Sequence, residues 1–494
     1  MQRIRVYSTV GSSLLTVGMR WTDRAIAIAS TVILARLLAP ADFGIVAMGS
    51  LVIGLADTLF NFSVHVALIR DPDVTQEHYD SAWTIGLLQA VASALVLVAA
   101  APLAAVYFAD ARVTAVVRAL AVSVLLTGLQ NIGMVQFQKN MQFGAEFRFL
   151  FFKRVAGFAA VVIAAATLRT YWALVIGTLV AGATGTLLTY KLHPMRPRLS
   201  FKRFREIFGV SQWMLVANIG DYLRVTLHKM LVGRWSSPSI MGAYSLADEI
   251  SSLPSGELLA PIGRALFPAF ASVKHDLAAL KEKFLLAQGI QTAIAVPAAV
   301  GLAAVAGDAV PVLLGEKWQS AVPFVQILAL ANIVQALCAS PNYALIIVGA
   351  VKATVLFVWT QVLFFAALAV TLFLGSGAVT IASLRLGVAV VALWVLFWLV
   401  MRSIPALRVT DLLVSTWRPL VSAAAMAAVV TWLSAHIDLR PAAALLVEIL
   451  VGAAVYGLGV IALWTLAGRP RGAESYVFDL LRGLRPVSQG HAGR

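Results

Sequence analysis

Residues 11–37 form a stretch that is long enough to cross a bilayer and mostly apolar, yet it contains charged side chains. Asp23 and Arg24 follow Arg20 by three and four residues, so an α-helix places all three on one side. A charge at the centre of a spanning helix costs roughly 2.5–3.5 kcal/mol, and such residues normally face a bundle interior or a wet cavity. Because one acid can neutralise only one of the two arginines, this face is expected to bind an anion.

The same arrangement recurs later in the chain at a constant sequence offset, which relates Asp23 to Asp221 in residues 207–233. The offset also relates the residues at which the two stretches end, namely Arg36 and Arg234, Pro40 and Pro238, and Gly44 and Gly242. Duplicated hydrophobic halves with charge at matching depth are typical of transporters, in which the substrate site lies between the repeats. We therefore expect the charged residues of both stretches to line one cavity.

The second stretch presents its polar residues on one helical face, and bases again outnumber the acid. These residues are Asn218, Asp221, Arg224 and His228, with Lys229 beside them. The guanidinium group of arginine is a planar fork that matches phosphate oxygens. The expected anion is a lipid head group or a substrate phosphate, although acids of a neighbouring helix could supply the partner charges instead.

Two further stretches carry polar residues at spanning depth. The first, residues 43–69, has one polar stripe, which consists of Asp57, Asn61 and His65. The second, residues 240–269, has a segment rich in acids and hydroxyls, which consists of Asp248, Glu249, Ser251, Ser252, Ser255 and Glu257, with Arg264 beyond it. Pro254 and Pro261 are expected to bend that helix and to free backbone carbonyls. For any one of these residues, an ion pair that only locks helices together remains the alternative.

The composition is that of an integral membrane protein. Of the 494 residues, 60% are hydrophobic and only 12% are charged, and the mean hydropathy is +0.88. A soluble globular protein has about 25% charged residues. Residues 94–105 and 388–401 are apolar without the alternation of a membrane β-barrel, so the spans should be helices. At about 20 residues per span, the sequence predicts an all-α protein with about 14 transmembrane helices.

Lysine and arginine are distributed unequally between the two sides of the predicted membrane. With a cytoplasmic N-terminus, the basic residues on the outer side are Arg36, Arg112, Arg169, Arg234, Lys317 and Arg440, and the inner side has most of the others. This bias predicts that the N- and C-termini are both cytoplasmic. It also accounts for most of the net charge of +15, and basic residues are not interleaved with aromatic ones, so no nucleic acid is expected as a partner.

Sequence patterns of catalytic and metal sites are missing. There is no glycine loop of the phosphate-binding kind, no HExxH and no nucleophile elbow, and the seven histidines do not cluster with metal-ligand spacing. The single cysteine, Cys338, excludes an internal disulfide and a cysteine-rich metal site. The sequence therefore predicts that the protein is not an enzyme and needs neither a cofactor nor a metal.

Four segments carry a resemblance to a known family. They are Ile33–Met48 (ILARLLAPADFGIVAM), Gln136–Phe149 (QFQKNMQFGAEFRF), Gly242–Pro254 (GAYSLADEISSLP) and Pro261–Phe270 (PIGRALFPAF). Together they resemble the polysaccharide transporter branch of the MOP (multidrug/oligosaccharidyl-lipid/polysaccharide) exporter superfamily, which contains the Wzx-type oligosaccharide flippases. The likeness extends over essentially the whole chain.

The resemblance implies a MATE-like architecture. Two lobes of six helices, related by a pseudo-twofold axis, would enclose a V-shaped central cavity, and two further helices would follow. The implied parts are an N-lobe (1–193), a basic cytoplasmic linker (194–206), a C-lobe (207–403), helices 13 and 14 (404–468) and a cytoplasmic tail (469–494).

The resemblance also implies a function. A protein of this family would move an undecaprenyl-diphosphate-linked oligosaccharide from the cytoplasmic to the periplasmic leaflet of a bacterial inner membrane by alternating access. The product would enter extracellular polysaccharide, O-antigen or capsule biosynthesis, including lipopolysaccharide. The expected partners of the monomer are this lipid-linked substrate, membrane lipid, and a polysaccharide polymerase or glycosyltransferase.

Roles for the individual residues follow from the implied function. The diphosphate would be held by Arg20, Arg24, Arg224, Lys229 and Arg264. Asp23 and Asp221 would orient the arginines and are candidates to take up a proton or a cation. Sugar hydroxyls would be bound by Asp57, Asn61, Asp248, Ser252 and Glu257, and the other polar residues of the cavity would be His65, Asn218 and His228.

Two other classes of protein remain as alternatives. A cation-coupled multidrug antiporter shares the fold and would confer drug resistance when overexpressed. A membrane-bound glycan polymerase or ligase acts on similar lipid-linked glycans, but such enzymes usually have a sizeable periplasmic loop. The longest outer loop expected here, residues 307–321, is short, which disfavours the enzyme.

Overall fold

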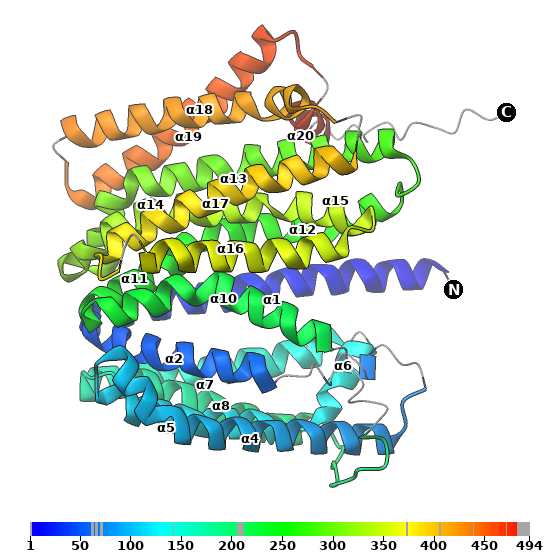
Figure 1. Ribbon diagram of the computed structural model, residues 1–494, viewed down its shortest axis with the longest axis vertical. Coiled ribbons are helices and arrows are strands. Elements are labelled where there is room, and N and C mark those ends of the chain that lie inside the picture. Colours follow the sequence, from blue (N-terminus) through cyan, green and yellow to red (C-terminus); the bar gives the residue numbers. More distant parts are fainter. Residues whose placement is uncertain are drawn as a thin grey trace. The chain divides into compact units, whose positions relative to one another are not determined.

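The computed structural model describes residues 2–60, 64, 68–69, 73–140, 142–204, 212–371, 374–404, 407–437, 439–470 and 472–481. Within these ranges every regular element is a helix, as the sequence predicts (Figure 1). The chain divides into two compact units, Met1–Ser245 and Leu246–Arg494. This division falls within a helix, and the boundaries of the lobes and the linker stay predictions.

The first unit is built from pairs of neighbouring helices. Its helices are α1 (Gln2–Leu37), α2 (Pro40–Phe60), α4 (Gln76–Phe108), α5 (Arg112–Gly128), α6 (Val135–Lys139), α7 (Phe143–Leu168), α8 (Trp172–Leu192) and α10 (Gln212–Trp235). α4 packs against α5 and α7 against α8, and both pairs lie side by side in Figure 1. α1 packs on α7, and α2 packs on α4, α5 and α10. The residues between these helices form two polar pockets, described below.

The second unit is organised around its longest helix, α13 (Leu277–Leu314), which packs against α14, α18 and α19. The other elements are α11 (Pro238–Ser251, which starts in the first unit), a π-helical turn (Pro254–Leu259), α12 (Ala260–Ala271), α14 (Val322–Leu337), α15 (Ala339–Ile347), α16 (Val351–Thr371), α17 (Ala378–Ser403), α18 (Val409–His436), α19 (Pro441–Leu466) and α20 (Ala473–Leu481). At Pro254 the α-helix gives way to a π-helical turn, and the bend predicted at Pro254 and Pro261 stays a prediction.

Among the described residues, 10 helices are long and apolar enough to cross a membrane, or up to 11 if α5 and the bent segment after it form one span. The predicted spans that do not meet this criterion correspond to α1, α10 and the pair α11–α12. These are the helices that carry the charged and hydroxyl-rich clusters. The number of about 14 spans therefore stays a prediction, whereas a multi-pass helical membrane protein is confirmed.

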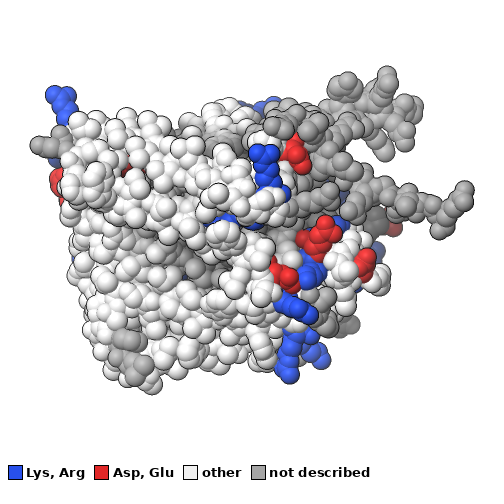
Figure 2. Space-filling model, turned by 90° about the horizontal axis from the view of Figure 1, so that it is seen from above, with Lys and Arg blue, Asp and Glu red and all other residues white. Residues whose placement is uncertain are grey.

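The surface has the charge distribution expected of such a protein. On the face drawn in Figure 2, most of the surface is white, and the blue and red side chains gather right of the centre, with a few more at the left edge. Many large hydrophobic side chains are exposed, including Leu103, Val106, Leu187 and Leu466, which are 71–82% exposed. Such exposure is expected of a membrane protein, because side chains on the part of its surface within the bilayer contact lipid and not water.

The matched Pro–Gly segments of the repeat contact each other. Pro40 begins α2 and Pro238 begins α11, the helix position that proline favours because its missing N–H has no partner there anyway. A Cβ added to Gly44 would overlap the carbonyl oxygen of Pro238, and one added to Gly242 would overlap the carbonyl oxygen of Pro40. The two helix starts therefore touch backbone to backbone, and glycine is required on both sides.

The segment that follows α8 is held by a buried histidine. His193 is 7% exposed, its Nδ1 accepts from the amide of Met195 (3.2 Å), and its Nε2 lies 3.1 Å from Oε1 of Gln136. A neutral ring with its proton on Nε2 satisfies both contacts. Burial, and then the positive charge of Arg196, lowers the pKa of His193 below its ordinary value. Further along, the amide of Arg198 donates to Asp80 (3.0 Å), so this basic segment is fixed to the start of α4.

Acidification is expected to loosen this segment. Because the folded state favours neutral His193, the segment has its full stability above the ordinary histidine pKa of about 6.5 and loses it as the pH falls below that value. The opening equilibrium should shift by roughly tenfold per pH unit at most, since one proton is involved. Hydrogen exchange of residues 194–200, corrected for the intrinsic effect of pH, measures this shift. The His193→Gln variant should show no such dependence, and an equal dependence in the variant would contradict the assignment.

Candidate functional site

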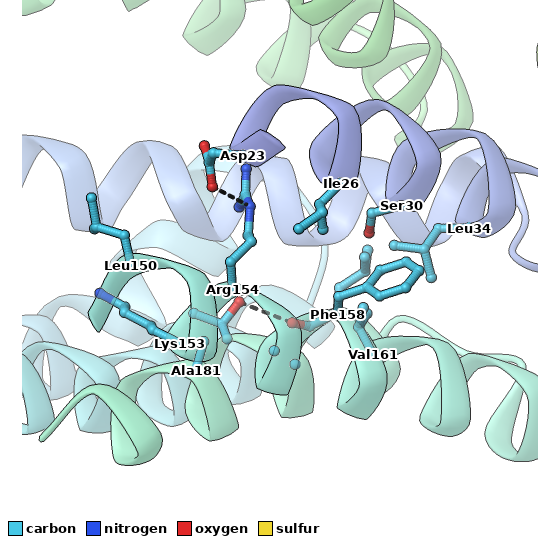
Figure 3. Close-up of a pocket in the computed structure, with 14 residues that line it drawn as sticks. Asp23, Ile26, Ser30, Leu34, Leu150, Lys153, Arg154, Phe158, Val161 and Ala181 are labelled. Carbon is cyan, nitrogen blue, oxygen red and sulfur yellow. Dashed lines mark hydrogen bonds and ion pairs between the residues drawn. The ribbon is translucent and has the colours of Figure 1, made fainter. Parts of the chain in front are cut away.

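An ion pair between two helices of the first unit lines a pocket of about 490 Å³. Oδ1 of Asp23 on α1 lies 2.9 Å from Nε of Arg154 on α7. Figure 3 shows the two side chains directed toward each other across the pocket, with Lys153 beside them. The walls come from α1, α7 and α8, and the ionisable residues among the lining are Asp23, Lys153 and Arg154. With two bases and one acid, the pocket has a net positive charge.

The helices approach closely around this pocket because glycines face larger side chains. A Cβ added to Gly177 of α8 would lie 2.5 Å from Cβ of Val161 on α7, and one added to Gly157 of α7 would lie 2.8 Å from Cβ of Ala181 on α8. Small residues of this kind allow helix backbones to approach in membranes. They fix α7 against α8, and α7 in turn presents Arg154 toward α1, whereas the Lys153 side chain lies next to Gly185 of α8.

The sequence predicted a different partner for Asp23. One of the arginines of its own helix was expected to neutralise it, whereas among the described side chains it pairs with Arg154. Lys153 and Arg154 were counted as inner basic residues next to a span, and were missed as site residues. The available signal was their position about ten residues into a continuous helix, where basic residues need a polar surrounding. Arg24 is partly buried on α1, and the side chain of Arg20 lies outside the described residues.

The second basic cluster, on α10, contains the predicted pair. Nη2 of Arg224 lies 2.6 Å from Oδ1 of Asp221, one helical turn away, and Arg224 is the more buried side chain (17% against 61% exposed). Lys229 is partly buried and Asn218 is exposed. Here the acid pairs with an arginine of its own helix, and its role in orienting that arginine for a ligand stays a prediction.

His228, on the predicted polar face of α10, is buried. Its ring is 1% exposed, Nδ1 lies 2.7 Å from the hydroxyl of Tyr244, and Nε2 lies 2.8 Å from the carbonyl of Val225. Helical spacing places His228 in line with Arg224, and its ring packs against Tyr244 of α11. Its place among the polar groups of a cavity stays a prediction.

The predicted stripe on α2 is described only in part. Asp57 is exposed and lines a second pocket of about 640 Å³ between α2, α4 and α5. Asn61 and His65 lie outside the described residues. The second pocket has no lysine or arginine among the described residues that line it. It differs in charge from the pocket of Asp23, Lys153 and Arg154.

In the second unit, Asp248 belongs to a buried network instead of standing open to a ligand. Nη1 of Arg385 on α17 lies 2.7 Å from Oδ1 of Asp248, and Nη2 of Arg385 donates to Oδ1 of Asn332 (2.6 Å). Asn332 on α14 also donates to Asp248 (3.2 Å). The side chains of Arg385 and Asp248 are 14% and 9% exposed. The network joins α11, α14 and α17, and the sequence did not single out Arg385.

The remaining predicted residues lie around the π-helical turn. The hydroxyl of Ser252 donates to the carbonyl of Glu249 (2.8 Å), and Glu257 is partly buried within the turn. Arg264 lies on α12, and its side chain is outside the described residues. Both predicted sets include side chains outside the described residues, so the shared roles of the phosphate set and of the sugar set stay proposals.

Polar pockets and an ion pair between long apolar helices are features of a multi-pass membrane protein with a polar interior. The family follows from the sequence, because residues 33–323 match the polysaccharide biosynthesis protein family. This match covers more than half of the chain, which therefore belongs to that family. The predicted resemblance to polysaccharide transporters is thereby confirmed.

Individual relatives agree with this assignment. The teichuronic acid biosynthesis protein TuaB of Bacillus subtilis (strain 168) is 23% identical over 308 residues, 62% of this chain and 63% of TuaB. The chain thus spans less than two thirds of that relative. The succinoglycan biosynthesis transport protein ExoT of Rhizobium meliloti (strain 1021) is 25% identical over 471 residues, 92% of each chain.

A solved structure shows the same fold. The lipid II flippase MurJ, in an inward closed conformation, matches with a TM-score of 0.73 and 12% identity over 92% of this chain and 100% of MurJ. At this identity the likeness establishes the fold alone. By their names, ExoT is a transport protein and MurJ is a flippase, so these two similar proteins are transporters and not enzymes.

Proposed function

We propose that the protein is a flippase that moves an undecaprenyl-diphosphate-linked oligosaccharide from the cytoplasmic to the periplasmic leaflet of a bacterial inner membrane. The observation that carries this proposal is the pocket between α1, α7 and α8, where Arg154 pairs with the single acid Asp23 and Lys153 adds a second basic group to the lining. The family and the MurJ-like fold support it. The names of ExoT and MurJ give transport and lipid flipping, respectively, as the activities of those proteins.

The chemistry of the pocket suits a diphosphate. An ion pair exposed by about half contributes only about 0–1 kcal/mol to stability, so stability alone is a weak reason to keep three charges here. Arg154 can offer its remaining N–H groups to phosphate oxygens, while Asp23 holds its Nε. In this proposal the same diphosphate is bound by other basic residues at other stages of transport. They are Arg24, Arg224 and Lys229, together with the predicted Arg20 and Arg264.

The acids have a supporting role in the proposed cycle. Asp23 and Asp221 orient Arg154 and Arg224, and an arriving phosphate would compete with them for these arginines. Release of either carboxylate would leave it free to take up a proton or a cation, which is one way to couple binding to a conformational change. We retain Asp57, Ser252 and Glu257 as groups that bind sugar hydroxyls.

Neutralising the basic residues tests the function. A charge-assisted hydrogen bond contributes about 1.5–3 kcal/mol, so Arg24→Gln, Arg154→Gln and Arg224→Gln should each lower transport about 10- to 100-fold. Flipping of the host's lipid-linked oligosaccharide in proteoliposomes measures the rate, and export of the polysaccharide by cells provides a second readout. Arg112→Gln is the control, since Arg112 is 50% exposed and pairs with Asp110 between α4 and α5.

The outcomes separate the candidate functions. Loss of transport in the three variants, with normal amounts in the membrane and normal transport by Arg112→Gln, supports the flippase. Normal transport by all three would contradict the phosphate role. Drug resistance on overexpression, without any effect of deletion on the polysaccharide, would identify a cation-coupled multidrug antiporter instead.

A further inference from the structure

The second pocket of the first unit is built from one face of each of three helices. On α4, Trp83, Gly86, Gln89 and Ser93 line it, and on α5, Ser123 and Thr127 do so. Ser50, Gly54 and Asp57 of α2 form the third wall. Its volume, about 640 Å³, falls within the range of about 300–1,000 Å³ that is usual for small-molecule sites.

Hydrogen-bonding groups around this pocket lack partners. Four lining side chains bury a polar atom that makes no hydrogen bond to the described part of the chain, namely Trp83 Nε1, Gln89 Nε2, Ser93 Oγ and Gln130 Nε2. Native proteins leave few buried polar groups unsatisfied, and each such group costs about 1–3 kcal/mol. Four of them around one pocket indicate that a hydrogen-bonding ligand, or the water that it displaces, completes the site.

The charge of the lining restricts the class of ligand. Asp57 is the ionisable group among the described lining residues, so a phosphate would be repelled here and is better placed beside Lys153 and Arg154. An apolar drug would leave the indole N–H and the amide groups without hydrogen bonds. A site built for hydrogen bonds strongly disfavours a ligand that cannot form them. A neutral molecule rich in hydroxyls can donate to the carboxylate and hydroxyl oxygens and accept from the N–H groups.

We infer that this pocket is a binding subsite for an uncharged sugar unit. The inference rests on the proposed function, in which the diphosphate of the same substrate occupies the basic pocket. Trp83 has the chemistry for both kinds of sugar contact, because its ring offers an apolar face and its N–H is a donor. Gln89 and Ser93 lie on the same face of α4 and bind hydroxyls, and Asp57 on α2 accepts from another hydroxyl.

Filling the pocket at Gly86 tests the subsite with little risk to the fold. A Cβ added to Gly86 meets no atom within 4 Å, so Gly86→Leu places its side chain in open space. Gly387 on α17 is exposed, also has nothing within 4 Å, and provides the matched control Gly387→Leu. The probes are undecaprenyl diphosphate alone and the lipid-linked oligosaccharide extracted from the producing cells, both in nanodiscs.

Gly86→Leu should weaken binding of the lipid-linked oligosaccharide at least about 10-fold, to the level of the bare carrier, because the excluded sugar unit loses two or more hydrogen bonds. Binding of undecaprenyl diphosphate alone should stay unchanged, and Gly387→Leu should behave as the wild type with both probes. If the wild type binds both probes equally, the pocket holds water only and the subsite is wrong. If the wild type binds neither probe, the proposed function itself fails.

Ser93→Ala separates ligand binding from structure. Because Ser93 Oγ makes no hydrogen bond to any residue that the structure describes, its removal should leave the melting temperature unchanged or raise it slightly. Loss of one hydrogen bond to the sugar should weaken binding of the lipid-linked oligosaccharide about 3- to 10-fold. A lower melting temperature together with unchanged binding would assign the hydroxyl a structural role and overturn its place in the subsite.

Discussion

Gly44→Ala is expected to destabilise the protein, although this exchange normally stabilises a helix. Alanine is favoured over glycine within a helix by about 0.8–1.0 kcal/mol. At Gly44, however, the added Cβ overlaps the carbonyl oxygen of Pro238, a backbone atom that cannot rotate away. Overpacking of this kind costs about 1–3 kcal/mol, so the sign of the effect should reverse. Thermal unfolding in detergent, followed by size-exclusion fluorescence, measures it.

The reciprocal contact gives the experiment its controls. Gly242→Ala should have a similar effect, because its Cβ overlaps the carbonyl oxygen of Pro40. The double variant should cost less than the sum of both, since one displacement of the two helix starts relieves both overlaps. Gly144→Ala, at an exposed position of α7 with no atom within 4 Å, should be neutral or stabilising. Equal stability of Gly44→Ala and the wild type would rule out the close contact.

Arg385→Met should strongly destabilise the second unit. Methionine fills a similar volume but leaves Asp248 without its guanidinium partner, and Asp248 is only 9% exposed. Removing one member of a buried ion pair costs about 3–5 kcal/mol, because the other charge is left uncompensated. The melting temperature of purified protein is the measurement.

A second substitution distinguishes loss of charge balance from loss of packing. Asp248→Asn removes the uncompensated charge, so Arg385→Met with Asp248→Asn should recover most of the lost stability. Arg385→Lys is expected to be intermediate, since lysine retains the charge but cannot bind Asp248 and Asn332 with a planar fork. If the double variant is no more stable than Arg385→Met alone, packing and not charge explains the role of Arg385.

The helices could be predicted from the sequence because long apolar runs and their polar interruptions are local properties. The offset between Pro40–Gly44 and Pro238–Gly242 also predicted that these segments are equivalent, and the structure adds that they touch. By contrast, the partner of Asp23 depends on which helix packs beside α1. No residue within 11–37 indicates that Arg154 is the partner, so the sequence predicted an arginine of the same helix as the ion-pair partner of Asp23.

For a related reason, charged residues of the candidate sites could be predicted from the sequence, whereas neutral ones could not. Charges within apolar stretches stand out in a sequence, and the pair of Asp221 and Arg224 was found in this way. Trp83, Gln89 and Ser93 are neutral and occur in a helix that reads as an ordinary span. Their importance follows only from the space between α2, α4 and α5 and from hydrogen bonds that are not made, both of which depend on tertiary packing.

The contact of Gly44 with Pro238 and of Gly242 with Pro40 has the form of a twofold interface within a single chain. Exchanging the two segments leaves the contact unchanged, as in an isologous interface between identical subunits. A shorter ancestor with only one copy of the repeat could have formed it between two molecules, with Gly44 of each against Pro40 of the other. Neither glycine could then change independently after duplication, because each one gives room to the proline of the other copy.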